Sequence, residues 1–143
     1  MSQTVLFLCT GNYFRSRYAE AIYNARAAAR GRAGTAISRG LAVERGVKNV
    51  GPMATTALKR LAKHGVQGPA LSRMPAAATR AELEGAGLII ALKEAEHRPL
   101  VTERWPAFVD RIEYWQVDDV DCCPAHEALD RIERLVDALL ERA

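Results

Sequence analysis

The feature that most limits the fold is a short apolar run that ends at a cysteine, with an arginine six positions later. The run is residues 5–8, the cysteine is Cys9 and the arginine is Arg15. Four apolar residues are too few to span a membrane and indicate a strand buried on both faces. Gly11 and Asn12 best tolerate positive φ, so the backbone N–H groups there can turn inward around an anion. We therefore predict a strand, a phosphate-binding loop and the first turn of a helix.

The predicted helix, residues 15–30, gives Cys9 a chemical role. Its positive N-terminal end, the inward amides and Arg15 would all favour the thiolate form of Cys9. The Arg15 guanidinium can also bind two phosphate oxygens at once. A thiolate at the base of a phosphate site suits phosphoryl transfer to sulfur. A buried structural cysteine is the alternative, but the strand before Cys9 and the helix after it favour the catalytic interpretation.

These residues resemble a known family. Residues 9–16 (Cys-Thr-Gly-Asn-Tyr-Phe-Arg-Ser) and 18–21 (Tyr-Ala-Glu-Ala) are similar to the signature of the low-molecular-weight protein tyrosine phosphatases, whose thiol-dependent arsenate reductase relatives share the fold. The resemblance extends to 38–40, 88–92 and 117–119, and so covers nearly the whole chain. It implies that Cys9 and Arg15 are catalytic and that Ser38 supports the loop. It also implies that phosphate is bound by Thr10, Gly11, Asn12, Tyr13, Phe14 and Ser16.

The chain also departs from the family pattern. Phe14 stands where the family usually has a second cysteine, Arg17 where it has a proline, and Val120 where a proline follows the general acid. The His-x-x-Arg element of many relatives appears as residues 70–73 without its histidine. These differences bear on substrate preference. They also bear on redox behaviour, because Phe14 cannot form a disulfide within the loop.

A general acid is expected after the last strand, at residues 112–115. The carboxyl ends of parallel strands share one edge of the sheet, so an acid from this loop can face Cys9. Such an acid would protonate the tyrosyl oxygen as it leaves and later take a proton from the attacking water. Asp118, Asp119 and Asp121 are the candidates. The family alignment selects Asp119, and we expect the other two to be solvated loop carboxylates.

The remaining elements alternate along the chain. Strands alternating with helices indicate right-handed crossovers. We therefore predict one domain over residues 1–143, an α/β fold in three layers with a doubly wound, four-stranded parallel sheet and helices on both faces. Further strands are expected at 35–38, 88–92 and 112–115. Further helices are expected between Pro52 and Gly65, near 80–84, over 94–101 and from Pro124 onward. Pro99 should bound or kink the helix over 94–101.

Charge is distributed unevenly along the 143 residues. Residues 1–80 carry 13 Lys and Arg against two Glu, whereas residues 81–143 carry seven against fifteen acidic groups, giving +11 and −8. The arginines form no basic tract with interleaved aromatics, which argues against nucleic-acid binding. The positive half is better suited to attracting anionic substrates. The N-terminal apolar run is too short for a signal peptide or a membrane span, so we expect a cytoplasmic protein that does not bind a membrane. We also expect a monomer.

The other candidate sites are weaker. Cys122-Cys123-Pro124-Ala125-His126 matches no usual zinc spacing, and vicinal cysteines rarely point to one centre. We expect no metal or other cofactor, and surface or core positions for His64 and His97. The sequence thus predicts a phosphomonoester hydrolase acting through phosphocysteine, most simply on phosphotyrosine. An arsenate reductase would need two further relay cysteines, and a non-catalytic phosphate-binding module would not need Asp119.

Overall fold

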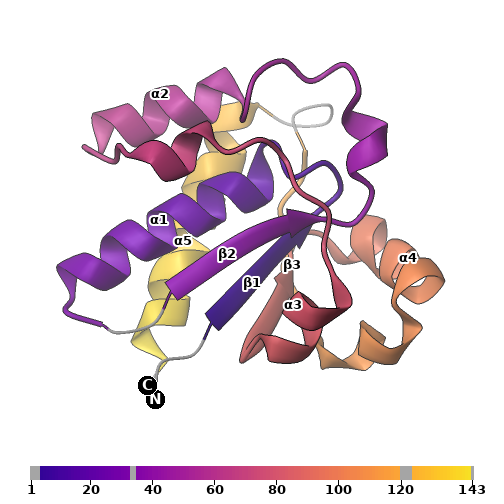
Figure 1. Cartoon of the computed structure of the whole chain (residues 1–143). Coiled ribbons are helices and arrows are strands. Elements are labelled where there is room, and N and C mark those ends of the chain that lie inside the picture. Colours follow the sequence, from indigo (N-terminus) through magenta and orange to yellow (C-terminus); the bar gives the residue numbers. More distant parts are fainter. Residues whose placement is uncertain (1–3, 33–34, 120–123, 143) are drawn as a thin grey trace.

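Four parallel strands form a single sheet in the computed structural model, which describes residues 4–32, 35–119 and 124–142 (Figure 1). The strands are β1 (Thr4–Cys9), β2 (Thr35–Gly40), β3 (Leu88–Ala91) and β4 (Ile112–Tyr114), in the order β2-β1-β3-β4. Every pairing is parallel, and Cys9 lies opposite Gly40 at the end of β1. This confirms the predicted four-stranded parallel sheet, with strand ends within one or two residues of those expected.

Successive side chains of β1 enter two different hydrophobic clusters. Val5, Phe7 and Cys9 pack on one face of the sheet, and Leu6 and Leu8 on the other. Both faces are buried, which explains why the strand is continuously apolar. The first face is covered by α1 (Arg15–Ala29), α2 (Thr55–Lys63) and α5 (Ala125–Glu141), and the second by α3 (Arg80–Gly85) and α4 (Glu94–Arg104) (Figure 1).

Helix α4 extends beyond the expected end at residue 101, and Pro99 does not bound it. The helix continues through Pro99 to Arg104. A proline removes the hydrogen bond to the carbonyl four residues earlier, here that of Ala95. Ala95 and Pro99 are both exposed, so this carbonyl lies on the water side of the helix. The opposite side is held by buried Leu100 and Val101, which pack in the second cluster.

Within the described residues, three short 3-10 helices were not predicted, because segments of one or two turns have little periodicity to read. They are η1 (Val43–Gly46), η2 (Pro69–Ser72) and η3 (Pro106–Arg111). Among the helices described, none is long and apolar enough to cross a membrane.

The strand order also fixes where a ligand can bind. The chain leaves β1 for β2 on one side and later enters β3 on the other. The carboxyl end of β1 is therefore a topological switch point, where open α/β sheets bind their ligands. Cys9 is the last residue of that strand.

Candidate active site

The loop from Thr10 to Phe14 connects β1 to α1 and bends sharply at Asn12, whose φ is 52°. Only part of the sequence-based expectation holds here, because Gly11 does not adopt positive φ. No side chain caps the N-terminus of α1, and its first turn holds no acidic residue. The free N–H groups of a helix N-terminus and its dipole favour an anion, so the loop and helix start suit phosphate.

The side chain of Cys9 lies in a directed hydrogen-bond chain. The Asn12 amide nitrogen donates to Ser16 Oγ at 2.9 Å, and Ser16 Oγ lies 2.9 Å from Cys9 Sγ. Because Ser16 Oγ accepts from Asn12, its own hydrogen is available to donate to the sulfur. This arrangement brings the predicted residues Ser16 and Asn12 to Cys9 and places a hydroxyl donor against its sulfur.

Asn12 is itself held from the far side of the loop. Its Oδ1 accepts from Arg73 Nη1 at 3.2 Å and from the Ala76 N–H at 3.1 Å, and its Nδ2 also donates to Ser38 Oγ at 3.0 Å. Two donors on Oδ1 fix the orientation of the amide, so Nδ2 must face the serines. Ser38 Oγ donates in turn to Glu20 at 2.7 Å. Arg73 thus supports the loop in a chain that lacks the histidine of the family pattern.

Arg15 is buried at the start of α1 with its guanidinium fixed on two sides. Nη1 donates to the Val117 carbonyl at 3.1 Å, and Nη2 donates to Glu96 Oε2 at 2.7 Å. Asp119 Oδ2 lies 3.5 Å from Nη2. Burial works against the charged form, but the hydrogen bond to Glu96 and the nearby negative groups at Cys9 and Asp119 outweigh it and raise the pKa of Arg15. The guanidinium therefore remains a permanent cation beside Cys9.

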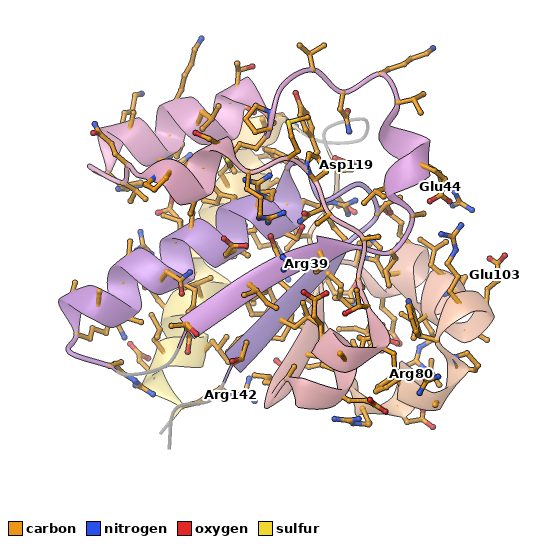
Figure 2. All side chains as sticks on the ribbon, viewed as in Figure 1. Arg39, Glu44, Arg80, Glu103, Asp119 and Arg142 are labelled. Atoms are coloured by element: carbon orange, nitrogen blue, oxygen red, sulfur yellow. The ribbon has the colours of Figure 1, made fainter. Side chains whose placement is uncertain are left out.

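Asp119 lies beyond the end of the sheet to which the strand arrows point (Figure 2). It lines the same crevice as Cys9 and Arg15, as expected for the candidate acid. Asp118, expected to be a solvated loop carboxylate, is partly exposed and pairs with Lys93 Nζ at 2.8 Å. The Lys93 pair fastens the 117–119 segment to the end of β3. Val120 and the third candidate, Asp121, lie outside the described residues.

Glu96 and His97 were not predicted as part of the site. Glu96 accepts hydrogen bonds from Arg15 and from the Thr10 hydroxyl, and its Oε2 lies 3.1 Å from His97 Nε2. Burial alone would raise the pKa of Glu96, but hydrogen bonds from His97, Arg15 and Thr10 hold it well below the usual range of a glutamate. Burial lowers the pKa of His97. A sequence signal did exist: polar residues in the first turn of a helix that follows a buried strand lie at the same sheet edge as Cys9.

Tyr13 and Arg17, the latter a departure from the family pattern, anchor one wall of the site, the segment 49–54. The Tyr13 hydroxyl donates to the Val50 carbonyl at 2.6 Å, and the Ala54 N–H donates to the Tyr13 carbonyl at 2.9 Å. Buried Arg17 donates to the Pro52 carbonyl at 2.7 Å. The resulting crevice has a volume of about 410 Å³ and is lined by Cys9, Thr10, Gly11, Tyr13, Phe14, Arg15, Asn49, Ala54, Thr56, Asp119 and Ala125.

The other sequence candidates lie away from the crevice or outside the described chain. His64, at the end of α2, lies 3.2 Å from Glu133 on the surface. Cys122 and Cys123 lie outside the described residues. Within the described ranges, no three His, Cys, Asp or Glu side chains are grouped so as to hold a metal ion.

Comparison with known proteins places this geometry in a family. The sequence profile described as "Low molecular weight phosphotyrosine protein phosphatase" matches residues 4–142. The chain is similar to the crystal structure of a low molecular weight protein tyrosine phosphatase from T. tengcongensis, with 26% identity and a TM-score of 0.81 over 99% of this chain and 100% of that one. No curated protein sequence matches.

Two further solved structures share the fold at lower identity. Vibrio vulnificus Wzb in complex with benzylphosphonate has 18% identity and a TM-score of 0.80, with both chains fully covered. The YwlE arginine phosphatase from Geobacillus stearothermophilus has 21% identity and a TM-score of 0.77 over 98% of this chain and 92% of that one. The profile match over nearly all residues is what decides the assignment: the chain belongs to the low molecular weight phosphotyrosine protein phosphatases, a family of cysteine-dependent phosphatases.

Proposed function

We propose that this protein hydrolyses phosphotyrosine in proteins through a phosphocysteine intermediate on Cys9. The observation that carries the proposal is that Cys9, Arg15 and Asp119 line one crevice although they come from three different parts of the chain. A nucleophile, a phosphate-binding cation and a candidate acid are the groups that this reaction needs.

In the first half-reaction the Cys9 thiolate attacks phosphorus, and the bond from phosphorus to the tyrosyl oxygen breaks. Asp119 gives its proton to that oxygen, so tyrosine leaves as a neutral phenol. Arg15 and N–H groups of the loop and of the start of α1 bind the equatorial oxygens, over which the negative charge is spread in the transition state. The products of this half-reaction are a phosphocysteine and an Asp119 carboxylate.

In the second half-reaction water attacks the phosphorus of phosphocysteine, and the P–S bond breaks. The Asp119 carboxylate takes a proton from the water, which restores the acid for the next cycle. The sulfur leaves as a thiolate, and the Ser16 hydroxyl, 2.9 Å from it, donates a hydrogen bond that stabilises this leaving group. Inorganic phosphate then dissociates from the loop.

The walls of the crevice favour an aryl phosphate. Tyr13, Phe14, Ala54 and Ala125 contribute its aromatic and aliphatic lining. A phenyl ring can pack against such surfaces while its phosphate reaches Cys9. The similarity of the fold to a structure that contains benzylphosphonate agrees with an aryl ligand.

The first test is hydrolysis of a chromogenic aryl phosphate, with phosphotyrosine, phosphoserine and phosphoarginine peptides compared at equal concentration. We expect turnover of the aryl phosphate and the phosphotyrosine peptide, and none by Cys9→Ser, because a serine hydroxyl is hardly ionised at neutral pH. The Cys9→Ser protein should still bind inorganic phosphate. A preference for phosphoarginine would overturn the proposed substrate, and an active Cys9→Ser protein would overturn the mechanism.

The same assay separates the alternatives. Reduction of arsenate with thiol recycling would support a reductase, and phosphate binding without any turnover would support a binding module. The resolving cysteines that a reductase needs could only be Cys122 and Cys123. We expect them to be structural, so peroxide-treated protein should show over-oxidised Cys9 rather than a disulfide from Cys9 to either of them.

A further inference from the structure

The carboxylate of Glu96 is held by three donors that belong to three different elements. Arg15 Nη2 at the start of α1 lies 2.7 Å from Oε2, and the Thr10 hydroxyl at the start of the phosphate-binding loop donates to the same oxygen. His97 Nε2 on α4 lies 3.1 Å away. One oxygen of Glu96 therefore connects the loop, the arginine and the helix that follows β3.

The direction of these hydrogen bonds is determined by the backbone. The Lys93 N–H donates to His97 Nδ1 at 3.0 Å. Nδ1 is therefore an acceptor, and neutral His97 must carry its hydrogen on Nε2, which faces both Thr10 Oγ1 at 3.2 Å and Glu96. The ring is fully buried, so this tautomer is fixed. Its N–H holds the Glu96 carboxylate in place from the side of α4.

Glu96 lies beside the crevice but not in its lining, whereas Arg15 is part of the lining. An arginine has five N–H donors in a fixed plane. Val117 and Glu96 each accept one of these hydrogen bonds, so Arg15 has further donors with which it can bind a phosphate. With two of its edges tied to separate elements, the guanidinium plane cannot rotate, so the remaining donors keep one direction.

The only other carboxylate paired with Arg15 in the described chain is the candidate acid, since Asp119 Oδ2 lies 3.5 Å from Nη2. Without Glu96, the guanidinium would turn toward Asp119 and form a closer ion pair. That pair would occupy donors needed for phosphate and would also keep Asp119 from the leaving group. The position of Glu96 therefore affects both halves of the proposed chemistry.

We propose that Glu96 is a positioning residue that holds the Arg15 guanidinium in its phosphate-binding orientation and keeps it from forming a closer ion pair with Asp119. The inference rests on the proposed function only in the role given to Arg15 as the phosphate-binding cation. It concerns oxyanion binding, whichever phosphorylated substrate the protein takes. Nothing in the family resemblance singled out this glutamate.

The test compares Glu96→Gln and Glu96→Ala with a matched control, Glu94→Gln. Glu94 stands in the same first turn of α4 but pairs with Arg98 on the surface. We expect Glu96→Gln to raise the KM for an aryl phosphate and the Ki for inorganic phosphate together by about tenfold, the loss of one charge-assisted hydrogen bond. Glu96→Ala should raise both further, and Glu94→Gln should change neither.

Two measurements separate this role from a merely structural one. Calorimetry can measure phosphate binding to Cys9→Ser with and without Glu96→Gln. This measurement needs no turnover, so it works even if phosphotyrosine is not the substrate. In an Arg15→Lys background the effect of Glu96→Gln should disappear, because the two residues act as one unit. A structural role would instead give the same fold-change in both backgrounds.

The opposite results would overturn the inference. If Glu96→Gln lowered KM and Ki, Glu96 would be a competitor of phosphate for Arg15. If Glu94→Gln had an equal effect, or the effects of Glu96→Gln and Arg15→Lys were additive, the role would be one of general stability. Should Glu96→Ala fail to fold, the Glu96→Gln protein alone decides.

Discussion

Helix α1 carries two clusters of arginines and carboxylates, one at each end, and they differ in almost everything but residue type. At its N-terminus Arg15 lies among Cys9, Glu96 and Asp119. Toward its C-terminus, Arg26 bonds to Glu133 at 2.8 Å and to Asp137 at 2.9 Å on α5. We call the second group, which also includes Tyr18 and Arg60, the α1–α5 seam: Tyr18 and Arg60 both contact Glu133.

The difference lies in burial and in what each cluster surrounds. The Arg15 side chain is 3% exposed and that of Arg26 is 25% exposed. The seam joins α1 and α5 to each other and to Arg60 on α2, and its charges pair with one another. The first cluster instead borders a crevice that Arg15 helps to line, and this buried cation has N–H donors beyond the two that bond to Val117 and Glu96. Identical side chains thus serve packing in one region and binding in the other.

The largest loss of kcat in this comparison should follow replacement of the candidate general acid, Asp119. Asp119→Ala should lower kcat by about 10²- to 10⁴-fold for phenols that are poor leaving groups, as is typical for lost general acid catalysis, and less for those that need no proton. Asp137→Ala in the seam should leave kcat unchanged. Steady-state assays with a series of aryl phosphates would show this, and equal losses for all leaving groups would refute the role of Asp119. Asp118→Ala should have a small effect, since Lys93 then loses only an exposed partner.

Arginine replacement compares the two clusters directly. Arg15→Lys should lower kcat/KM by about 10²- to 10³-fold, because an ammonium ion cannot bind two phosphate oxygens in one plane while also reaching Val117 and Glu96. Arg26→Lys should leave kcat/KM unaltered. A mild defect in Arg15→Lys would mean that the loop does not bind phosphate through this residue.

The seam should show the reverse behaviour, an effect on stability without one on activity. Glu133→Ala would leave the buried Tyr18 hydroxyl without its acceptor, at a cost of about 1–3 kcal/mol in the free energy of unfolding. Urea denaturation of wild type and variant, alongside an aryl phosphate assay, measures both quantities. A loss of kcat at temperatures where the variant is fully folded would show that the two clusters are coupled.

The smallest effect concerns the pH dependence of stability. Burial lowers the pKa of His97 below 6.5, so the unfolded chain binds its proton at a higher pH than the folded chain does. Stability should therefore fall as the pH drops below about 6.5, by at most about 1.4 kcal/mol per pH unit from this one group. In His97→Gln that part of the slope should vanish. Unfolding midpoints at about pH 7 and about pH 5 would reveal it, and an unchanged slope would contradict a neutral buried His97.

Much of the fold could be predicted from the sequence because local patterns and sheet rules act together. The continuous apolar residues of β1 and β3 reflect burial on both faces, and the alternation of elements sets the parallel order. The position of Cys9 at the edge followed from the same rules. Asn12 took the positive φ that its side chain permits, whereas Gly11 did not.

The unpredicted parts of the site depend on contacts that are distant in sequence. Arg73 reaches Asn12 across 61 positions and Glu96 reaches Arg15 across 81, and neither spacing has a local pattern. His97 on a helix face resembles an ordinary core residue until its Nε2 is seen beside Thr10. The length of α4 was missed for a different reason, since only solvent exposure makes Pro99 tolerable there.

The central claim, that catalysis passes through a phosphorylated Cys9, can be tested by trapping. Asp119→Ala removes the base for the second half-reaction, so an aryl phosphate with a good leaving group should phosphorylate the protein faster than water releases it. Rapid acid quench and mass spectrometry of the peptides should then find phosphate on Cys9, and none in the Cys9→Ser, Asp119→Ala double variant. Release of the phenol without any phosphate on Cys9, or with phosphate on another residue, would contradict this account.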